Sequence, residues 1–194
     1  SSLGIAAELT RGTDTKICVV CDFPFGLSTT RSKVMQAEEY CRGGAVGELD
    51  VVAHFGWIRS GMFAEVEEDL RAVAEVCHAF GVGVKVMFET DALSLDELRL
   101  ACEAGIAAGA DFLKTSTGFF TGGKSDGATS EVIALMIETA RGRCKVKGSG
   151  GIRDQPHFFE LIDMGIDRMG IGYRPTPVVL GMTAEEAKRL RAQS

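Results

Sequence analysis

The chain has 194 residues, of which 45% are hydrophobic and 25% are charged, an ordinary composition for a globular protein with one sizeable core. The net charge of -6 is not gathered in one tail, and no basic stripe suggests binding to nucleic acid. No apolar run approaches the roughly 20 residues that span a bilayer, and no leader peptide is recognisable, which favours a cytoplasmic protein without a membrane partner. We therefore expect a single domain over residues 1–194 that acts on a small molecule.

The six cysteines lie mostly in apolar surroundings, which is typical of a reducing compartment rather than of a disulfide framework. Cys18 and Cys21 form a C-x-x-C sequence, but it falls in an extended run, where residues three apart point to opposite faces. We interpret both as ordinary thiols rather than a redox or zinc site, and we expect neither a metal nor a cofactor.

Short apolar runs bounded by turn residues predict six buried parallel strands, at residues 17–21, 49–53, 84–88, 112–114, 146–148 and 168–171. Segments with three-to-four-residue periodicity predict helices, at residues 30–42, 62–80, 95–108, 130–140, 156–164 and 184–192. Several helical segments end at a glycine suited to the left-handed residue that closes a helix: Gly43, Gly81, Gly109, Gly142 and Gly165. This alternation predicts an α/β fold with a parallel sheet and right-handed crossovers.

Polar residues at the strand ends favour a closed barrel over an open doubly wound sheet. Asp50, Glu89, Lys114 and Lys147 fall on predicted strands or at their C-terminal ends, where a barrel collects its catalytic groups. An open sheet usually has a glycine-rich phosphate turn after its first strand, and none follows Cys21. We therefore predict a TIM (β/α)8-type barrel. Because six strands are predicted, the first two β/α units are expected to be absent, and the open edges would invite pairing with another chain, such as a homo-oligomer.

Lys114 is the last residue of the strand predicted at residues 112–114. The segment around it, residues 111–118, reads Asp-Phe-Leu-Lys-Thr-Ser-Thr-Gly. Lysine is rarely buried without a partner or a task, and a desolvated amine tends to lose its proton, which frees the lone pair to attack a carbonyl. Lys114 is therefore a candidate nucleophile. The alternative is a structural lysine that reaches out of the barrel to pair with Glu89 or Asp50.

The next predicted strand supplies Lys147, again just before a turn. Two ammonium groups that face one cavity repel each other, which favours loss of one proton, so Lys147 could activate Lys114. Asp50 is the nearest candidate acid to balance the two amines and to move protons through a water molecule. Its alternative role is that of a structural ion-pair partner.

Glycines follow the last two predicted strands, in Lys147-Gly-Ser-Gly-Gly151 and in Gly170-Ile-Gly172. Glycine turns at these positions expose backbone N–H groups, and barrels frequently hold a phosphate there. A phosphorylated substrate is implied, although the same glycines could serve only as tight connections.

Five motifs occur in one order between Lys16 and Gly172: Phe23-Pro-Phe-Gly26, Asp50-Val-Val, Val84-Lys-Val-Met-Phe-Glu-Thr90, Lys114-Thr-Ser-Thr-Gly-Phe119 and Val146-Lys-Gly-Ser-Gly-Gly-Ile-Arg153. Together they resemble the deoxyribose-phosphate aldolase family. The resemblance implies that Lys114 forms the Schiff base, that Lys147 tunes it and that Asp50 is the acid of a proton relay. It also implies that Thr117 and Gly118 line the substrate, and that the phosphate is held by Gly150, Gly151, Gly170 and Gly172.

The reaction implied by this resemblance is the reversible cleavage of 2-deoxyribose 5-phosphate into acetaldehyde and glyceraldehyde 3-phosphate, without a metal. Two alternatives stay open from the residues alone. One is a non-catalytic barrel that binds a sugar phosphate or a protein partner. The other is a lysine-dependent lyase that acts on an unphosphorylated aldehyde.

The sequence departs from the family pattern at three places. The segment Gly170-Ile-Gly-Tyr-Arg174 lacks the phosphate-binding serines, so Arg174 could replace them with a bidentate contact, or Tyr173 could narrow the pocket for another acceptor. His54 stands where the family usually has an asparagine-like residue, and a packed core role is the alternative to a catalytic one. An N-terminal segment with an Asp-His-Thr-type motif is not found in this sequence.

Overall fold

The computed structural model describes residues 2–183, 185–186 and 188–189, and within them six parallel strands form one sheet in the order β1-β2-β3-β4-β5-β6. The strands are β1 (Cys18–Cys21), β2 (Glu48–Val52), β3 (Gly83–Met87), β4 (Phe112–Lys114), β5 (Lys145–Ser149) and β6 (Arg168–Gly170). The helices are α1 (Leu3–Leu9), α2 (Thr30–Arg42), α3 (Phe55–Arg59), α4 (Phe63–Ala79), α5 (Leu95–Ala107), α6 (Ser130–Ala140), α7 (Gln155–Asp163) and α8 (Thr176–Val179), with a 3-10 turn η1 (Thr90–Ala92).

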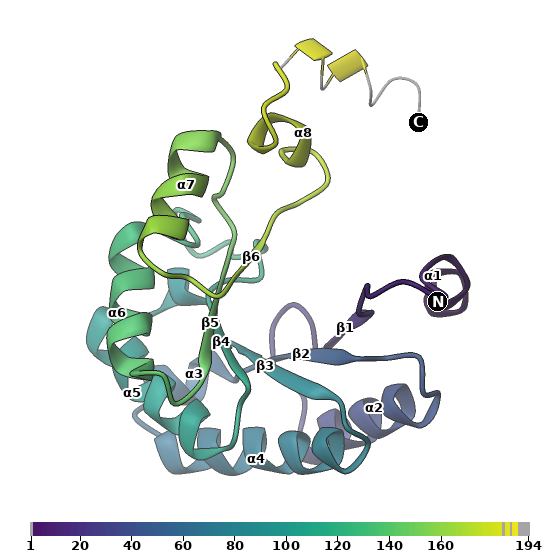
Figure 1. Cartoon of the computed structure of the whole chain (residues 1–194). Helices are drawn as coiled ribbons and strands as arrows, with labels where there is room; N and C mark the ends of the chain where they lie inside the picture. Colours follow the sequence, from purple (N-terminus) through teal and green to yellow (C-terminus); the bar gives the residue numbers. More distant parts are fainter. Residues whose placement is uncertain (1, 184, 187, 190–194) are drawn as a thin grey trace.

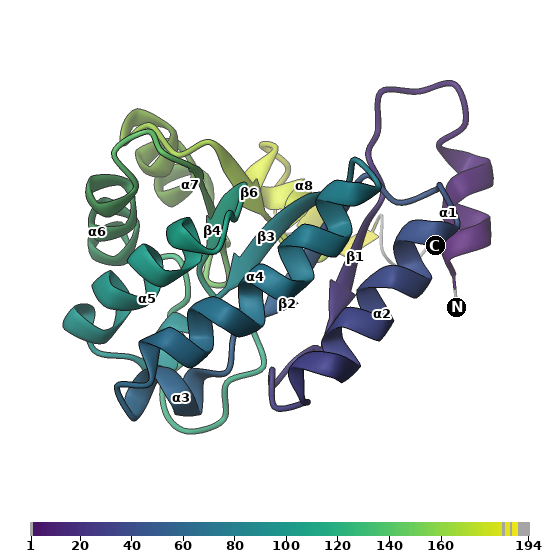
Figure 2. The same ribbon diagram turned by 90° about the horizontal axis from the view of Figure 1, so that it is seen from below.

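The strands follow an arc, with β1 and β6 at its two ends and α2, α4, α5, α6 and α7 on its outer side (Figure 1). Seen from below, α2, α4 and α5 lie side by side beneath the sheet (Figure 2), in agreement with the contacts between neighbouring helices. An arc of consecutive parallel strands covered by helices on one side is part of a barrel wall. The prediction of a TIM-type barrel with six strands is therefore confirmed.

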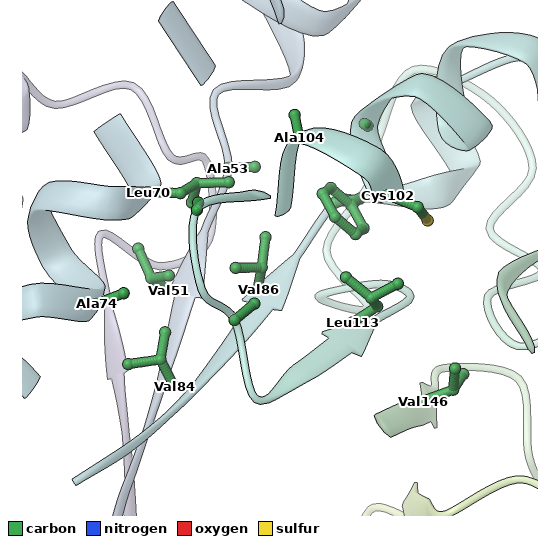
Figure 3. Close-up of a cluster of buried hydrophobic side chains, with 14 of the residues drawn as sticks. Val51, Ala53, Leu70, Ala74, Val84, Val86, Cys102, Ala104, Leu113 and Val146 are labelled. Carbon is green, nitrogen blue, oxygen red and sulfur yellow. The ribbon is translucent and has the colours of Figure 1, made fainter. Parts of the chain in front are cut away.

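The two faces of the sheet differ in polarity because successive side chains point to opposite sides. On the outer face, Val51, Val84 and Val86 are at most 1% exposed and belong to one cluster with Leu70 and Ala74 of α4 (Figure 3). On the inner face, strands β2 to β5 carry charged residues: Glu48, Asp50, Lys85, Lys114 and Lys147. Burial of the outer face fixes the register, and the register in turn fixes which charged residues meet.

Helices α2 and α6 have the predicted bounds because each begins at a capping threonine. Thr29 accepts a hydrogen bond from the backbone N–H of Ser32, and Thr129 accepts one from that of Val132. Strand β4 also has the predicted bounds, and the other predicted helices and strands within the described residues differ from the observed ones by a residue at one or both ends. The short helices α3 and α8 were not predicted, because four or five residues are too few to show an apolar stripe.

One glycine prediction is wrong. Gly43 has φ -70° and continues the helical conformation, while Gly44, with φ 68°, makes the left-handed turn. Gly81, Gly109, Gly142 and Gly165 have φ values from 71° to 89°, as predicted for residues that end a helix. The helix predicted at residues 184–192 lies in large part outside the described residues.

None of the helices in the described part of the chain is long and apolar enough to cross a membrane.

A buried ion pair that the sequence analysis did not predict joins α2 to α4. Lys33 Nζ lies 2.6 Å from Asp69 Oδ2 and donates to the Val52 carbonyl oxygen at 3.2 Å, and both charged side chains are at most 1% exposed. Removing one partner of a buried pair leaves the other charge unpaired, which costs about 3 to 5 kcal/mol. We therefore expect Lys33→Met to lower the free energy of unfolding by about that amount in urea denaturation.

The matched control is Arg42→Met, which breaks the exposed pair with Glu38 on the same helix and should cost less than about 1 kcal/mol. The double variant Lys33→Met/Asp69→Leu should regain much of the lost stability because no buried charge is left unpaired. Equal costs for Lys33→Met and Arg42→Met would show that the buried pair contributes no more than a surface pair.

Candidate active site

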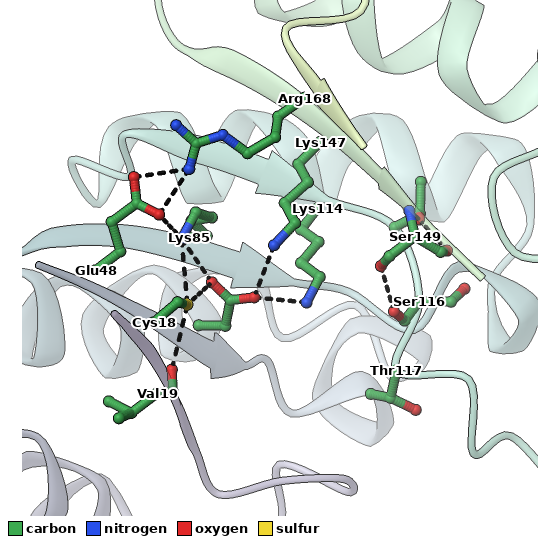
Figure 4. Close-up of polar contacts among 12 residues, drawn as sticks. Cys18, Val19, Glu48, Lys85, Lys114, Ser116, Thr117, Lys147, Ser149 and Arg168 are labelled. Atoms are coloured by element: carbon green, nitrogen blue, oxygen red, sulfur yellow. Dashed lines mark hydrogen bonds and ion pairs between the residues drawn. The ribbon is translucent and has the colours of Figure 1, made fainter. Parts of the chain in front are cut away.

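Asp50 of β2 contacts three lysines from three neighbouring strands, Lys85, Lys114 and Lys147, which are labelled in Figure 4. Its Oδ2 atom is 2.5 Å from Lys114 Nζ of β4 and 3.3 Å from Lys147 Nζ of β5. Its Oδ1 atom is 2.9 Å from Lys85 Nζ of β3. Because Lys114 and Lys147 share one oxygen, their nitrogens cannot be further apart than the sum of those two distances. The convergence of the two amines expected from the sequence is therefore observed.

These charges are largely withdrawn from water. The side chains of Asp50, Lys114 and Lys147 are 2%, 10% and 12% exposed. Burial opposes ionisation of Asp50, but Lys114, Lys147 and Lys85 outweigh it and hold the pKa of this carboxyl well below its ordinary range. Asp50 is therefore a carboxylate, able to accept hydrogen bonds from both amines.

The lowered amine pKa belongs to Lys147. Burial first, and then the positive charge of Lys114, lower the pKa of Lys147, and the attraction of Asp50 does not fully offset them. The sequence analysis assigned the neutral amine to Lys114 instead. Lys147 shares the Asp50 Oδ2 atom with Lys114, so the uncharged form that its lowered pKa favours can take a proton from Lys114 by way of that oxygen.

Four further residues of this cluster received no role in the sequence analysis. Glu48 Oε2 is 2.6 Å from Lys85 Nζ, and Arg168 Nη1 lies 2.7 and 2.6 Å from the two oxygens of Glu48. The Cys18 thiol donates to Asp50 Oδ1 at 3.0 Å. The signal that could have revealed Glu48 is its two-residue spacing from Asp50 on one predicted strand, which places both carboxylates on one face.

The segment after Lys114 is held by acids at the end of β3. Thr117 donates from its hydroxyl to the carboxylate of Glu89, and Asp91 accepts the hydroxyl of Ser116 at 2.9 Å. Asp91 also accepts the backbone N–H of Gly127 at 2.9 Å, so one carboxylate ties the end of β4 to the loop before α6. Thr117 is therefore fixed in position beside the lysines. Gly118 follows it with φ 81°, a conformation that suits glycine.

The predicted phosphate-binding glycines close the neighbouring turns. Gly150 and Gly151 have φ values of 83° and 76°, and a Cβ on Gly151 would lie 2.1 Å from the Asp126 carbonyl oxygen. A Cβ on Gly170 would lie 3.3 Å from Lys147 Cε, so this glycine leaves room for the second amine. The Gly172 carbonyl accepts the backbone N–H of Thr176 at 3.2 Å and thereby starts α8. Gly150, Gly151 and Gly170 therefore have structural reasons to be glycine, whereas a Cβ on Gly172 would meet Pro175 only at an ordinary contact distance of 3.7 Å.

The model of the DeoC/LacD aldolase family matches residues 1–174. The chain belongs to the DeoC/LacD aldolase family. It is 42% identical over 171 residues to a deoxyribose-phosphate aldolase of Exiguobacterium sibiricum, which covers 88% of this chain and 74% of that protein. It is 40% identical over 179 residues to the deoxyribose-phosphate aldolase of a Geobacillus species, covering 92% of this chain and 77% of the relative.

Solved structures agree with this family assignment. An aldolase described as QR15 superposes with a TM-score of 0.80 at 34% identity, over 100% of this chain and 81% of that one. The deoxyribose phosphate aldolase of Aeropyrum pernix, described as having a unique tetrameric structure, superposes with a TM-score of 0.77 at 26% identity, over 97% of this chain and 74% of that one. The arc of six strands is therefore the wall of a DeoC-type barrel.

The departures expected for this family member have clear positions in the structure. Tyr173, which is 72% exposed, and Arg174 lie just after β6, and the Arg174 guanidinium donates to the Tyr173 hydroxyl at 3.2 Å. His54 caps α3 by accepting the backbone N–H of Trp57 at 3.2 Å, and its ring stacks on the Trp57 ring at 4.4 Å. His54 thus has a packing and capping role.

Cys18 is exposed and Cys21 is buried, so the two thiols do not form a pair.

Among the described residues, no group of three or more His, Cys, Asp and Glu side chains is arranged to hold a metal ion.

Proposed function

We propose that this chain is a class I aldolase that reversibly cleaves 2-deoxy-D-ribose 5-phosphate into acetaldehyde and D-glyceraldehyde 3-phosphate through an imine on Lys114. The observation that carries the proposal is the buried carboxylate of Asp50, which binds Lys114 and Lys147 through one oxygen atom. A buried amine next to a proton acceptor is what attack on an aldehyde requires. The identity to aldolases of this substrate, close to 40% over most of the chain, supports the choice of substrate.

The chemistry follows from these contacts. The Lys114 amine adds to the aldehyde carbon C1 of the open-chain sugar, and loss of water gives a protonated imine. A base removes the proton of the C3 hydroxyl, the C2–C3 bond breaks, and its electron pair moves into the imine to give an enamine. The C3 fragment leaves as glyceraldehyde 3-phosphate. Protonation of the enamine at C2 and hydrolysis of the imine then release acetaldehyde and restore the amine.

The proton transfers fall to Lys147 and Asp50. The lowered pKa of Lys147 favours its uncharged form, which can accept the proton that Lys114 must lose before it attacks. Asp50 contacts both amines and keeps its charge, so it stabilises the positive charge of the imine where no water screens it. We further propose that Thr117 and Gly118 contact the substrate, and that the phosphate binds near Gly150, Gly151, Gly170, Gly172, Tyr173 and Arg174.

Release of acetaldehyde, followed by its reduction with NADH and an alcohol dehydrogenase, tests this function. 2-Deoxyribose 5-phosphate should be cleaved with a much lower KM than 2-deoxyribose, and Arg174→Ala should raise the KM only for the phosphorylated sugar. Equal KM values for the two sugars would favour a lyase for unphosphorylated aldehydes. No cleavage of either sugar would favour a barrel that only binds its ligand.

The role of Lys147 predicts a change in pH dependence. Without the second amine, Lys114 is left paired with Asp50 alone, which favours its charged form. In Lys147→Leu we therefore expect kcat to fall about a hundredfold and the rising limb of kcat/KM to move to higher pH. The control is Lys124→Leu, which removes a lysine whose side chain is 84% exposed and which should leave the profile in place. An unchanged profile in Lys147→Leu would remove Lys147 from the mechanism.

We also propose that the protein forms a homo-oligomer. Within the described residues β1 and β6 are the edge strands of the sheet, and exposed edges can pair with another chain. The Aeropyrum pernix relative is described as tetrameric. Light scattering should give a mass above that of one chain, and a monomer at micromolar concentration would contradict the proposal.

A further inference from the structure

Arg168 and Glu48 meet across the inner face of the sheet. Arg168 lies on the edge strand β6 and Glu48 on β2, and three strands separate them in the sheet order. Arg168 Nη1 nevertheless donates to both oxygens of Glu48, at 2.7 and 2.6 Å. The guanidinium also lies 4.7 Å from the centre of the Phe112 ring of β4. The contact therefore bridges β2 and β6 across the inner face of the curved sheet, and the Arg168 guanidinium packs on the Phe112 ring.

Glu48 connects this contact to the lysines. Its Oε2 atom is 2.6 Å from Lys85 Nζ, and Lys85 Nζ is 2.9 Å from Asp50 Oδ1 (Figure 4). Lys85 is 1% exposed, so its ammonium group has no water to replace a lost partner. Charges of opposite sign thus alternate from Arg168 through Glu48 and Lys85 to Asp50.

We propose that Arg168 and Glu48 form a clamp that holds Lys85 on Oδ1 of Asp50 and thereby reserves Oδ2 for Lys114 and Lys147. The two residues are positioning residues, since they act through Lys85 and not on the substrate. The inference deepens the proposed function and rests on it, because Lys114 and Lys147 matter only if they take part in the chemistry.

The contacts give the physical reason for a clamp. A buried ammonium with a single carboxylate beside it would approach both of its oxygens and compete with the other amines. Glu48 supplies a second carboxylate on the other side of Lys85, and Arg168 fixes that carboxylate with two hydrogen bonds. Burial opposes ionisation of Glu48, but the hydrogen bonds from Arg168 and Lys85 outweigh it and lower the pKa of Glu48. Glu48 is therefore charged.

The charged groups around the cluster decide how removal of each partner changes the pH profile. Asp50 and Glu48 face Cys18 of β1, Lys85 of β3, Lys114 of β4, and Lys147 and Arg168 of β5 and β6. Lys16, Lys145 and the carboxylate residue Asp111 line the same cavity of about 290 Å³ as Glu48 and Arg168. Loss of Glu48 makes this cluster more positive and disfavours charged amines, whereas loss of Arg168 makes it more negative and favours them.

The test compares Glu48→Gln, Arg168→Met and the double variant in the cleavage of 2-deoxyribose 5-phosphate. Each single variant should lower kcat about tenfold and change KM by less than about twofold, because the relay and not substrate binding is disturbed. The rising limb of kcat/KM should move by about half a pH unit, to lower pH in Glu48→Gln and to higher pH in Arg168→Met. The kcat of the double variant should equal that of a single variant. The rising limb of its kcat/KM profile should lie at nearly the same pH as in the unmodified protein.

The matched control is a second bidentate pair, between Arg143 and Glu103, with both distances 2.8 Å and both side chains more than 40% exposed. Arg143→Met and Glu103→Gln should leave kcat and the pH limb unchanged. The clamp would be overturned if the rising limb of kcat/KM moved in the same direction in Glu48→Gln and Arg168→Met. It would also be overturned if kcat in these variants stayed within twofold of that of the unmodified protein.

If the clamp variants do not fold, Arg168→Lys and Glu48→Asp keep the charges and lose only the geometry. These two variants should lower kcat without moving the rising limb of kcat/KM. A kcat equal to that of the unmodified protein in both would overturn the proposal. The unmodified protein is assayed in parallel for an imine trapped by borohydride. If the unmodified protein forms no trapped imine, the proposed function itself is contradicted. If it forms the imine but the clamp variants behave like the control variants, only the clamp is contradicted.

Discussion

In Lys114→Ala, cleavage of 2-deoxyribose 5-phosphate is expected to fall by a factor of about 10⁴ or more, because the amine that forms the covalent bond is gone. Lys147 remains in the cavity, but it contacts Asp50 at the longer distance of 3.3 Å and comes from the neighbouring strand. It is therefore displaced from the position at which Lys114 would meet the aldehyde. The turnover number with saturating substrate is the measurement that checks this loss.

Lys124→Ala is the control for Lys114→Ala, since the Lys124 side chain is 84% exposed and pairs with Asp126 in the loop before α6. Its turnover should equal that of the unmodified protein. Retention of more than about one per cent of turnover in Lys114→Ala would assign the nucleophile to another residue.

Asp50→Asn is expected to lower both turnover and stability. The amide cannot accept a proton or balance the charges of three lysines, so turnover should fall by a factor of about 10² to 10³. Formation of the imine should fall much less, because the Lys114 amine is still present. The free energy of unfolding should drop by about 3 kcal/mol, at the lower end of the range for a broken buried pair, since Lys85 keeps its contact with Glu48.

The stability difference between Asp50→Asn and the unmodified protein should also depend on pH. The pKa of Asp50 is depressed in the folded state, so its ionisation stabilises the fold above the unfolded carboxyl pKa of about 3.9. That contribution is lost as the pH falls through the lower, folded-state pKa. Urea denaturation should therefore show the full difference at pH 7 and a smaller one in strong acid. If the yield of trapped imine in Asp50→Asn falls as much as the turnover, at any pH, Asp50 is structural rather than part of the proton relay.

The strands and the positions of the two lysines proposed as catalytic were predictable because they depend on local patterns. Leu49, Val51 and Val84 are buried between sheet and helices, and burial of one face at a period of two residues is visible in a sequence. Lys114 and Lys147 stand at the ends of such strands, and their neighbours in register are each other. A parallel sheet therefore brings them together without further information.

The rest of the cluster depends on curvature and distance, which no local pattern contains. Arg168 and Glu48 are far apart in the chain and meet only because the sheet bends, so their contact could not be predicted from strand order. The lowered pKa of Lys147 depends on its burial and on the positive charge of Lys114 beside it, which only the folded structure brings about. The left-handed turn falls on Gly44 rather than Gly43 because Gly43, the residue that caps α2, keeps a right-handed helical conformation, which the periodicity does not fix.

The central claim is that Lys114 and Lys147 act on one aldehyde through Asp50, with Lys114 as the residue that bonds to it. Incubation with acetaldehyde and sodium borohydride, followed by digestion and mass spectrometry, tests it most directly. One reduced ethyl group per chain on Lys114 at neutral pH, lost in Lys114→Ala and diminished in Lys147→Leu, is the predicted result. Modification at Lys147 or Lys85 instead, or none at all, would contradict it.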